Sequence, residues 1–213
     1  MDNKTIKNKK LKERILTISY KKGLSHIGSC ITALPIIDEI FQIKKPDEKF
    51  VLSSGHAGLA LYVILEKHKG LNAEKIFDHH GVHPDRCVDC GIDCSSGSLG
   101  HGLGVSVGMA LADRSKNVYC LISDGECAEG SIWEALRIRR ENNLDNIKIY
   151  LNFNRWGAYC SVPFPPTDID PKNYGVIVKE TNTNGWPSYL QGQMAHYKVL
   201  NEEEYKECLE AAK

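Results

Sequence analysis

The stretch Val118-Tyr119-Cys120-Leu121-Ile122-Ser123-Asp124-Gly125 decides the fold class of this chain. Its first five residues are apolar and include strong strand formers, which predicts a buried strand that ends at the Ser-Asp-Gly triplet. Working outward, similar apolar runs predict strands at 50–52, 147–153 and 176–179. Helical spacing predicts helices at 5–23, 31–43, 57–68, 100–113, 129–142 and 201–212, with Pro35 in the first turn of its helix. Strands that alternate with helices indicate an α/β fold with a mostly parallel sheet flanked by helices.

The composition excludes several classes of protein. The 213 residues are 42% hydrophobic, and 27 basic residues balance 27 acidic ones. Such a chain can form a core, and it has no net charge to attract nucleic acid, so we interpret its lysine-rich start as a solvated helix face. We find no run long enough to cross a bilayer and no signal peptide. We therefore expect a cytoplasmic protein with reduced cysteines and no nucleic-acid or membrane partner.

Polar residues follow three of the predicted strands. They are Ser54-Gly55-His56, Ser123-Asp124-Gly125 and Asn152-Phe153-Asn154. Ligands of open parallel sheets bind beyond the carboxyl ends of the strands, so these residues are expected at one crevice. Asp124 and Asn154 supply two oxygens, a set that Mg²⁺ accepts when phosphate and water complete its octahedron. The glycine-rich segment 96–102 opens a helix, where free backbone N–H groups favour a phosphate.

The same glycines allow a second interpretation. Together with Asp124 they are similar to a dinucleotide-binding fingerprint, in which an acid about 20 residues downstream binds the ribose. No register gives the full spacing, because the third glycine position falls on Val105 or Val107. The glycines also follow a cysteine-rich loop instead of a strand, which disfavours a dinucleotide site.

Five ordered motifs resemble the transketolase family. Glu129-Gly130, Trp133-Glu134-Ala135 and Asn154 follow Asp124 as in its thiamine diphosphate motif, although Ser123 replaces the usual first glycine. The other matching segments are Ser25-His26-Ile27-Gly28, Leu52-Ser53-Ser54-Gly55-His56-Ala57, His83-Pro84-Asp85 and Ser96-Gly97-Ser98-Leu99-Gly100-His101-Gly102. The resemblance covers 26–156. It implies a thiamine-diphosphate-binding fold, with residues 1–213 as a single diphosphate-binding domain that is shortened after about residue 157.

The resemblance also implies roles for individual residues in holding the cofactor. Asp124, Asn154 and the backbone carbonyl of Trp156 would bind Mg²⁺, and Gly125 would let the diphosphate approach the backbone closely. The cofactor would be lined by His56, Gly97 and Leu99. Taken singly, Asp124 is also compatible with a helix N-cap and Asn154 with a turn.

Four further residues are implied in catalysis. His26 and His83 would face the sugar substrate, while Glu129 and Glu134 fall where the family has acidic residues at the subunit interface that links two active sites. The family also has a D-G-H motif whose histidine approaches the cofactor. Residues 157–174 are rich in proline (Pro163, Pro165, Pro166 and Pro171) and contain no such histidine, so one cofactor contact is expected to be missing.

The resemblance implies a two-chain enzyme, because transketolases need a second domain that binds the aminopyrimidine ring of the cofactor. We expect the small subunit of a thiamine-diphosphate-dependent transketolase that transfers a two-carbon ketol unit between sugars, in a specialised sugar pathway. It would be inactive without a pyrimidine-domain partner, with which it forms an α₂β₂ heterotetramer. The alternatives are a subunit of an enzyme with a 2-oxo acid donor, and a non-catalytic regulatory or binding subunit.

Three cysteines lie close together in the loop between the predicted helices 57–68 and 100–113. His83, Cys87, Cys90 and Cys94 could surround a tetrahedral Zn²⁺. Structural zinc sites more often pair two short knuckles separated by a longer span, and His83 is also implied in substrate binding. The competing interpretation is a set of reduced loop thiols.

Overall fold

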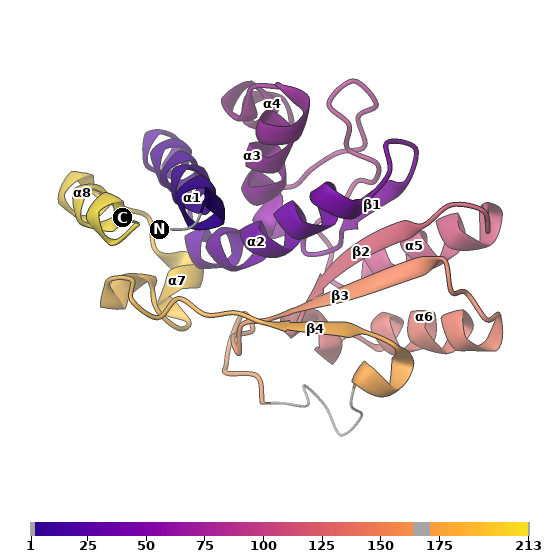
Figure 1. The fold of residues 1–213 in the computed structure, drawn as a ribbon. Helices are drawn as coiled ribbons and strands as arrows, with labels where there is room; N and C mark the ends of the chain where they lie inside the picture. The colour runs from indigo at the N-terminus through magenta and orange to yellow at the C-terminus, as the bar shows by residue number, and fades with distance from the viewer. Residues whose placement is uncertain (1–2, 164–170, 213) are drawn as a thin grey trace.

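The computed structural model describes residues 3–163 and 171–212, and Pro165 and Pro166 lie outside these ranges. In the described part of the chain, four parallel strands form one sheet in the order β1 (Lys49–Leu52), β2 (Val118–Ser123), β3 (Ile147–Phe153) and β4 (Ile177–Glu180). All the carboxyl ends therefore meet at one edge. This confirms the α/β fold with a parallel sheet (Figure 1).

Helices connect the strands, and further helices precede and follow them in the chain. The larger ones are α1 (Asn3–Lys22), α2 (Ile27–Ile43), α3 (Gly58–Lys69), α5 (His101–Ala112), α6 (Gly130–Glu141) and α8 (Glu202–Ala211). Shorter helices are α4 (Ala73–His80), α7 (Met194–Tyr197), η1 (Gly55–Ala57), η2 (Gly125–Ala128), η3 (Pro171–Tyr174) and η4 (Ser188–Leu190). None of the described helices is both long and apolar enough to span a bilayer.

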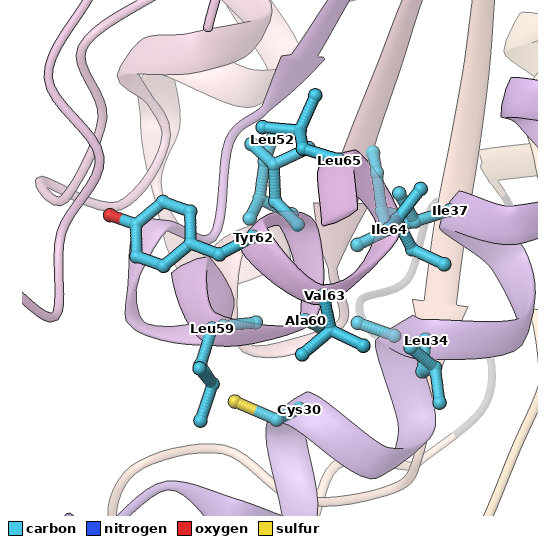
Figure 2. Close-up of a cluster of buried hydrophobic side chains, with 14 of the residues drawn as sticks. Cys30, Leu34, Ile37, Leu52, Leu59, Ala60, Tyr62, Val63, Ile64 and Leu65 are labelled. Atoms are coloured by element: carbon cyan, nitrogen blue, oxygen red, sulfur yellow. The ribbon is translucent and has the colours of Figure 1, made fainter. Parts of the chain in front are cut away.

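The two faces of the sheet bury alternate residues of each strand, as the pleat requires. On one face, Leu52 and Leu121 pack with α2 and α3, and Figure 2 shows part of this cluster around Leu34, Tyr62 and Ile64. On the opposite face, Val51, Cys120, Ile122 and Leu151 pack with residues of α5 and α6. The first three strands are thus buried on both sides between two helical layers, which explains their mainly apolar sequences, whereas β4 at the edge is partly exposed.

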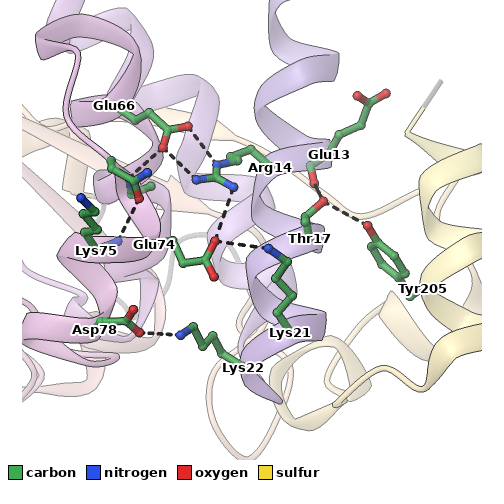
Figure 3. A network of polar contacts seen from close by, with 12 residues as sticks. Glu13, Arg14, Thr17, Lys21, Lys22, Glu66, Glu74, Lys75, Asp78 and Tyr205 are labelled. Carbon is green, nitrogen blue, oxygen red and sulfur yellow. Dashed lines mark hydrogen bonds and ion pairs between the residues drawn. The ribbon is translucent and has the colours of Figure 1, made fainter.

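Helix α1 is fixed to the rest of the molecule by charges as well as by apolar packing (Figure 3). The Arg14 guanidinium donates to both carboxylate oxygens of Glu66 at 2.9 and 3.0 Å. Lys22 pairs with Asp78 at 2.6 Å. These basic side chains are engaged within the chain, which agrees with the interpretation of this segment as a helix face and not as a nucleic-acid surface.

Two helices differ from what the local sequence rules predict. Helix α2 begins at Ile27 and contains Pro35 in its interior, not in its first turn. Burial on nearly all sides stabilises this helix despite the missing proline N–H. Helix α4 forms in a polar stretch without a clear helical pattern, and Asn72 caps its N-terminus by accepting from the Lys75 N–H.

Candidate functional site

A cavity of about 220 Å³ lies at the edge of the sheet where the strands end. Each of the first three strands contributes residues to it. The lining includes Ser54 and His56 after β1, Ser123 and Gly125 at the end of β2, and Asn152 and Asn154 at the end of β3. This is the crevice that the sequence predicted from the three polar strand ends.

Asp124 and Asn154 are held by the backbone at this edge. Asp124 accepts the N–H of Gly125 through Oδ1 at 3.0 Å and the N–H of Arg155 through Oδ2 at 2.6 Å. Asn154 accepts the N–H of Trp156 through Oδ1 at 2.9 Å. Arg155 has a φ of 71°, in the left-handed region, so the chain turns sharply between these residues. The turn places the Arg155 N–H against the Asp124 carboxylate, beside the paired ends of β2 and β3.

Asp124 is only 1% exposed. Burial raises the pKa of its carboxyl group to about 6, although backbone N–H groups of Arg155 and Gly125 oppose this shift. Among the described residues no basic side chain forms an ion pair with it. A buried carboxylate without a protein cation fits a bound metal ion, which would supply the missing positive charge.

Gly125 provides a close approach of two backbone segments at the cavity. A Cβ built on Gly125 would lie 3.3 Å from the Cα of Gly157. Both glycines line the cavity, as does Trp156. The absence of side chains at these two glycines leaves room for a ligand next to Asp124.

Glu126 was missed by the sequence analysis. Its carboxylate is fully buried and accepts from Ser53 Oγ at 2.6 Å, from the Gly100 N–H at 2.9 Å and from the Ser123 N–H at 2.9 Å. It therefore joins the ends of β1 and β2 to the start of α5. The spacing Ser123-x-x-Glu126, typical of a capping box, was the available signal.

This arrangement satisfies part of the start of α5 within the protein, and a phosphate at this helix start stays a prediction. The N–H of Gly100 donates to the Glu126 carboxylate, and the N–H of His101 lies 3.4 Å from the Ser98 carbonyl. The negative group at this helix start is thus a side chain of the protein itself. Gly97 and Leu99 line the cavity. In the described part of the chain, these glycines follow α4 and a loop and not a strand, which disfavours the dinucleotide fingerprint.

Three histidines cluster at one side of the cavity. The ring centroid of His26 lies 5.4 Å from that of His56 and 4.7 Å from that of His196. Burial lowers the pKa of His26 to about 4 and that of His56 to about 3, with neighbouring histidines adding to both shifts. The cluster is therefore uncharged at neutral pH and offers hydrogen bonds without positive charge.

His196 was not predicted. It comes from α7, more than 40 residues beyond Asn154, where no motif marks it. His196 lines the cavity, and the missing cofactor contact expected from residues 157–174 stays a prediction. His26 is fixed by its backbone N–H, which donates to the His196 carbonyl at 2.9 Å, and has a φ of 61°.

His83 lies at the cavity, and Glu129 and Glu134 do not. His83 is exposed, and its ring would lie 3.2 Å from a Cβ built on Gly97. Glu129 and Glu134 are exposed at and near the start of α6 and do not line the cavity. Within the described residues these two acids lie away from the cavity. They can act at a reaction site only if a neighbouring subunit brings one to them.

The predicted zinc ligands do not come together as expected. Cys87 and Cys90 lie near His80, whereas His83 faces the cavity. Cys94 packs against the cluster on the α5 side of the sheet, while Cys87 and Cys90 pack against the cluster on the α2 side. The set of His83, Cys87, Cys90 and Cys94 is therefore wrong, because its members are divided between different parts of the fold.

Comparison with known proteins identifies relatives of this chain. The family described as "Transketolase, thiamine diphosphate binding domain" matches residues 42–157. One subunit of the apulose-4-phosphate transketolase of Phocaeicola vulgatus is 36% identical over 171 residues, which cover 70% of this chain and 60% of the relative. Human transketolase is 36% identical over 162 residues, covering 66% of this chain and 26% of the relative. The chain thus spans 60% or less of the length of these curated relatives.

Solved structures show the same fold. The transketolase of Campylobacter jejuni superposes on all of this chain with a TM-score of 0.78 at 20% identity, and the match covers 43% of that chain. The transketolase of Leishmania mexicana gives a TM-score of 0.75 at 18% identity, covering 98% of this chain and 41% of that chain. Both matches concern the arrangement of sheet and helices described above.

Proposed function

Because this chain belongs to the transketolase family, in its thiamine-diphosphate-binding domain, we propose that it is the diphosphate-binding subunit of a two-chain transketolase. The enzyme transfers a two-carbon ketol unit from a ketose to an aldose. The observation that carries this proposal is the buried Asp124 carboxylate, placed beside Asn154 at the strand ends and next to a cluster of uncharged histidines.

The cavity residues fit the cofactor. Asp124, Asn154 and the backbone carbonyl of Trp156 would hold Mg²⁺; Asn154 and Trp156 line the cavity, and the burial of Asp124 without a protein cation supports its part in this set. Gly125 leaves the space in which the diphosphate approaches the backbone. The cofactor is also lined by His56, Gly97 and Leu99. When bound, thiamine diphosphate supplies the carbanion chemistry, and the protein orients it.

The histidines bind the sugar. His26 and His83 hydrogen-bond its hydroxyl and carbonyl groups and exchange protons with them, and His196 extends this surface. Neutral imidazoles both donate and accept, which suits neighbouring hydroxyl groups of a sugar. This favours a sugar donor over a 2-oxo acid, whose carboxylate calls for a positive partner.

A partner subunit completes the site. The relative from Phocaeicola vulgatus is named as one subunit of its transketolase, which supports a split enzyme here as well. The partner binds the pyrimidine ring, and Glu129 and Glu134 lie at the contact that links two active sites in an α₂β₂ assembly. Their exposure in the described chain supports this position.

The proposal extends to the organisation and location of the chain. Residues 1–213 form one diphosphate-binding domain that is shortened after about residue 157. The cysteines in the described residues are all free, which supports a reducing compartment such as the cytoplasm. The retained Asp124, Asn154 and cavity histidines oppose a non-catalytic role.

Native mass spectrometry tests the assembly. The chain is mixed with its pyrimidine-domain partner, thiamine diphosphate and Mg²⁺. We expect a heterotetramer that carries the cofactor, and neither chain alone should retain it to the same extent. A chain that forms no complex and binds no cofactor under these conditions would instead be a non-catalytic member of the family.

A further inference from the structure

The loop between α4 and α5 contains a cluster of metal-binding side chains outside the cavity. His80 is the last residue of α4, and Cys87 and Cys90 follow in the loop. One ligand atom of each lies within 4.8 Å of the others, and His80 Nε2 is 3.4 Å from Cys90 Sγ. All three residues are partly buried, so they are protected and still reachable from solvent. Two thiols and an imidazole at this spacing suggest a soft divalent metal.

The backbone around the two cysteines already has the shape of a metal-binding knuckle. Cys87 and Ile92 form an antiparallel bridge in which each N–H donates to the other residue's carbonyl, at 2.9 and 2.8 Å. Gly91 closes the turn with a φ of 73°. Within it, the N–H of Cys90 points at Cys87 Sγ at 3.2 Å, a contact that stabilises a thiolate at that sulfur.

The separation of two of the three ligand atoms fits zinc. A tetrahedral Zn²⁺ with ordinary Zn–N and Zn–S bonds holds its nitrogen and sulfur ligands about 3.5 Å apart. The observed separation of His80 Nε2 and Cys90 Sγ is 3.4 Å. The third ligand atom, Cys87 Sγ, lies within 4.8 Å of the other two. The fourth tetrahedral position takes a water molecule, since the neighbouring Val88 and Asp89 are exposed.

We propose that His80, Cys87 and Cys90 bind a zinc ion that fixes the loop bearing His83. Binding releases the two thiol protons and forms two Zn–S bonds and one Zn–N bond, with no change of oxidation state. The ligands His80 and Cys87 lie on either side of His83 in the sequence. The metal thus closes the segment 80–87 into a ring and restrains the residue that lines the cavity.

The rest of the loop transmits this restraint. Its arms are joined where the Ser96 N–H donates to the Pro84 carbonyl at 3.0 Å and the Arg86 N–H donates to Ser95 Oγ at 2.7 Å. At its base, a Cβ on Gly58 would lie 2.4 Å from the Val82 carbonyl, so the loop packs closely on α3. The knuckle is anchored on one side by Ile92, which is buried in the core, and by Asp93, which accepts the Phe50 N–H at 3.0 Å. A metal held by His80, Cys87 and Cys90 adds an anchor on the side of α4.

Metal content tests the proposal independently of enzyme activity. The chain is purified without chelators under reducing conditions, zinc is measured by elemental analysis, and the stripped chain is titrated with Co²⁺ to detect thiolate charge-transfer absorption. We expect close to one metal ion per chain. His80→Ala, Cys87→Ser and Cys90→Ser should each lose most of the metal, whereas Cys94→Ser and His83→Ala should retain it. Circular dichroism verifies that each variant is folded.

Tryptic cleavage after the exposed Arg86 provides a second readout, on the wild-type chain. Removing zinc should accelerate cleavage at this site several-fold, and adding Zn²⁺ back should reverse the change. The proposal is overturned if the wild-type chain takes up neither zinc nor cobalt. It is equally overturned if the three ligand variants keep the wild-type metal content, or if Cys94→Ser loses it as completely as they do.

Discussion

The backbone N–H of Arg155 donates to Oδ2 of Asp124 at 2.6 Å and so ties the end of β3 to the end of β2. The donor lies 31 residues beyond the acceptor, in the turn that also carries Asn154 and Trp156. Together with the parallel pairing of β2 and β3, this contact places the proposed metal ligands of two strands at one edge of the sheet. It also leaves Asp124 buried with neutral donors alone, a condition that costs free energy until a cation binds.

Replacing Asp124 by Asn should abolish cofactor retention, with some loss of stability because the amide nitrogen cannot accept from the Arg155 or Gly125 N–H. Asparagine keeps the size of the side chain but removes the charge that holds Mg²⁺, so we expect the affinity for thiamine diphosphate with Mg²⁺ to fall by about 100-fold or more. Titration calorimetry on the chain with its partner measures this. Asp145→Asn, at an exposed position, is the matched control and should bind as the wild type does. Equal affinities for the two variants would refute the role of Asp124.

Glu126→Gln should lower the stability of the fold, although Glu126 does not line the cavity. The two carboxylate oxygens accept from Gly100 and Ser123, and the amide nitrogen of Gln cannot replace either acceptor, so a buried N–H is left without a partner. We expect a loss of about 2–3 kcal/mol in the free energy of unfolding. Urea denaturation measures it, with the exposed Glu203→Gln as a control that changes little. If both variants unfold alike, the network around Glu126 does not hold the strand ends.

Gly125→Ala should weaken cofactor binding and also lower the stability of the fold slightly. The added methyl lies 3.3 Å from the Gly157 backbone, a contact that costs about 1 kcal/mol of stability. It also occupies the space proposed for the diphosphate, so cofactor affinity should fall at least about tenfold. Gly104→Ala is the control: nothing lies near its Cβ inside α5, and it should gain up to about 1 kcal/mol with unchanged affinity. A Gly125→Ala chain with wild-type affinity would place the diphosphate elsewhere.

The histidine cluster should make folding stability sensitive to acid. The unfolded chain protonates its histidines near pH 6.5, whereas the folded chain protonates His26 only near pH 4 and His56 near pH 3. Below pH 6.5 the unfolded state therefore binds more protons, and stability falls as the pH drops through this window.

Substitution isolates this effect. Unfolding free energies measured at pH 7 and pH 4.5 should differ less in His56→Gln than in the wild type. The exposed His101→Gln should leave the wild-type difference unchanged. An identical pH dependence in all three proteins would mean that His56 is protonated as readily in the folded chain as in the unfolded one.

Local sequence patterns predicted the strands well, and the reason is physical. Ile147–Phe153 is buried on both faces, so its apolar run has the same limits as the strand. The start of α2 was harder to predict. Proline is unfavourable inside a helix, but burial of most of α2 outweighs this cost.

For the site, the sequence placed polar residues at the strand ends, and of these His56 and Asn154 line the cavity while Asp124 is buried in the turn beside it. Their roles toward the cofactor stay predictions. The sequence pattern missed Glu126, since an acid is rarely fully buried, and His196, since α7 reaches the cavity only through the tertiary fold. It also grouped Cys94 with Cys87 and Cys90, although alternate packing against the two faces of the sheet separates them. Proximity in sequence did not reveal this division.

The most direct test of the account is ketol transfer measured in reconstituted mixtures. The chain, its pyrimidine-domain partner and the equimolar mixture are each assayed with thiamine diphosphate, Mg²⁺ and a panel of ketose donors and aldose acceptors. The account predicts transfer by the mixture alone, and none when the chain carries Asp124→Asn. Transfer by the isolated chain, or a mixture that keeps full activity with Asp124→Asn, would contradict it.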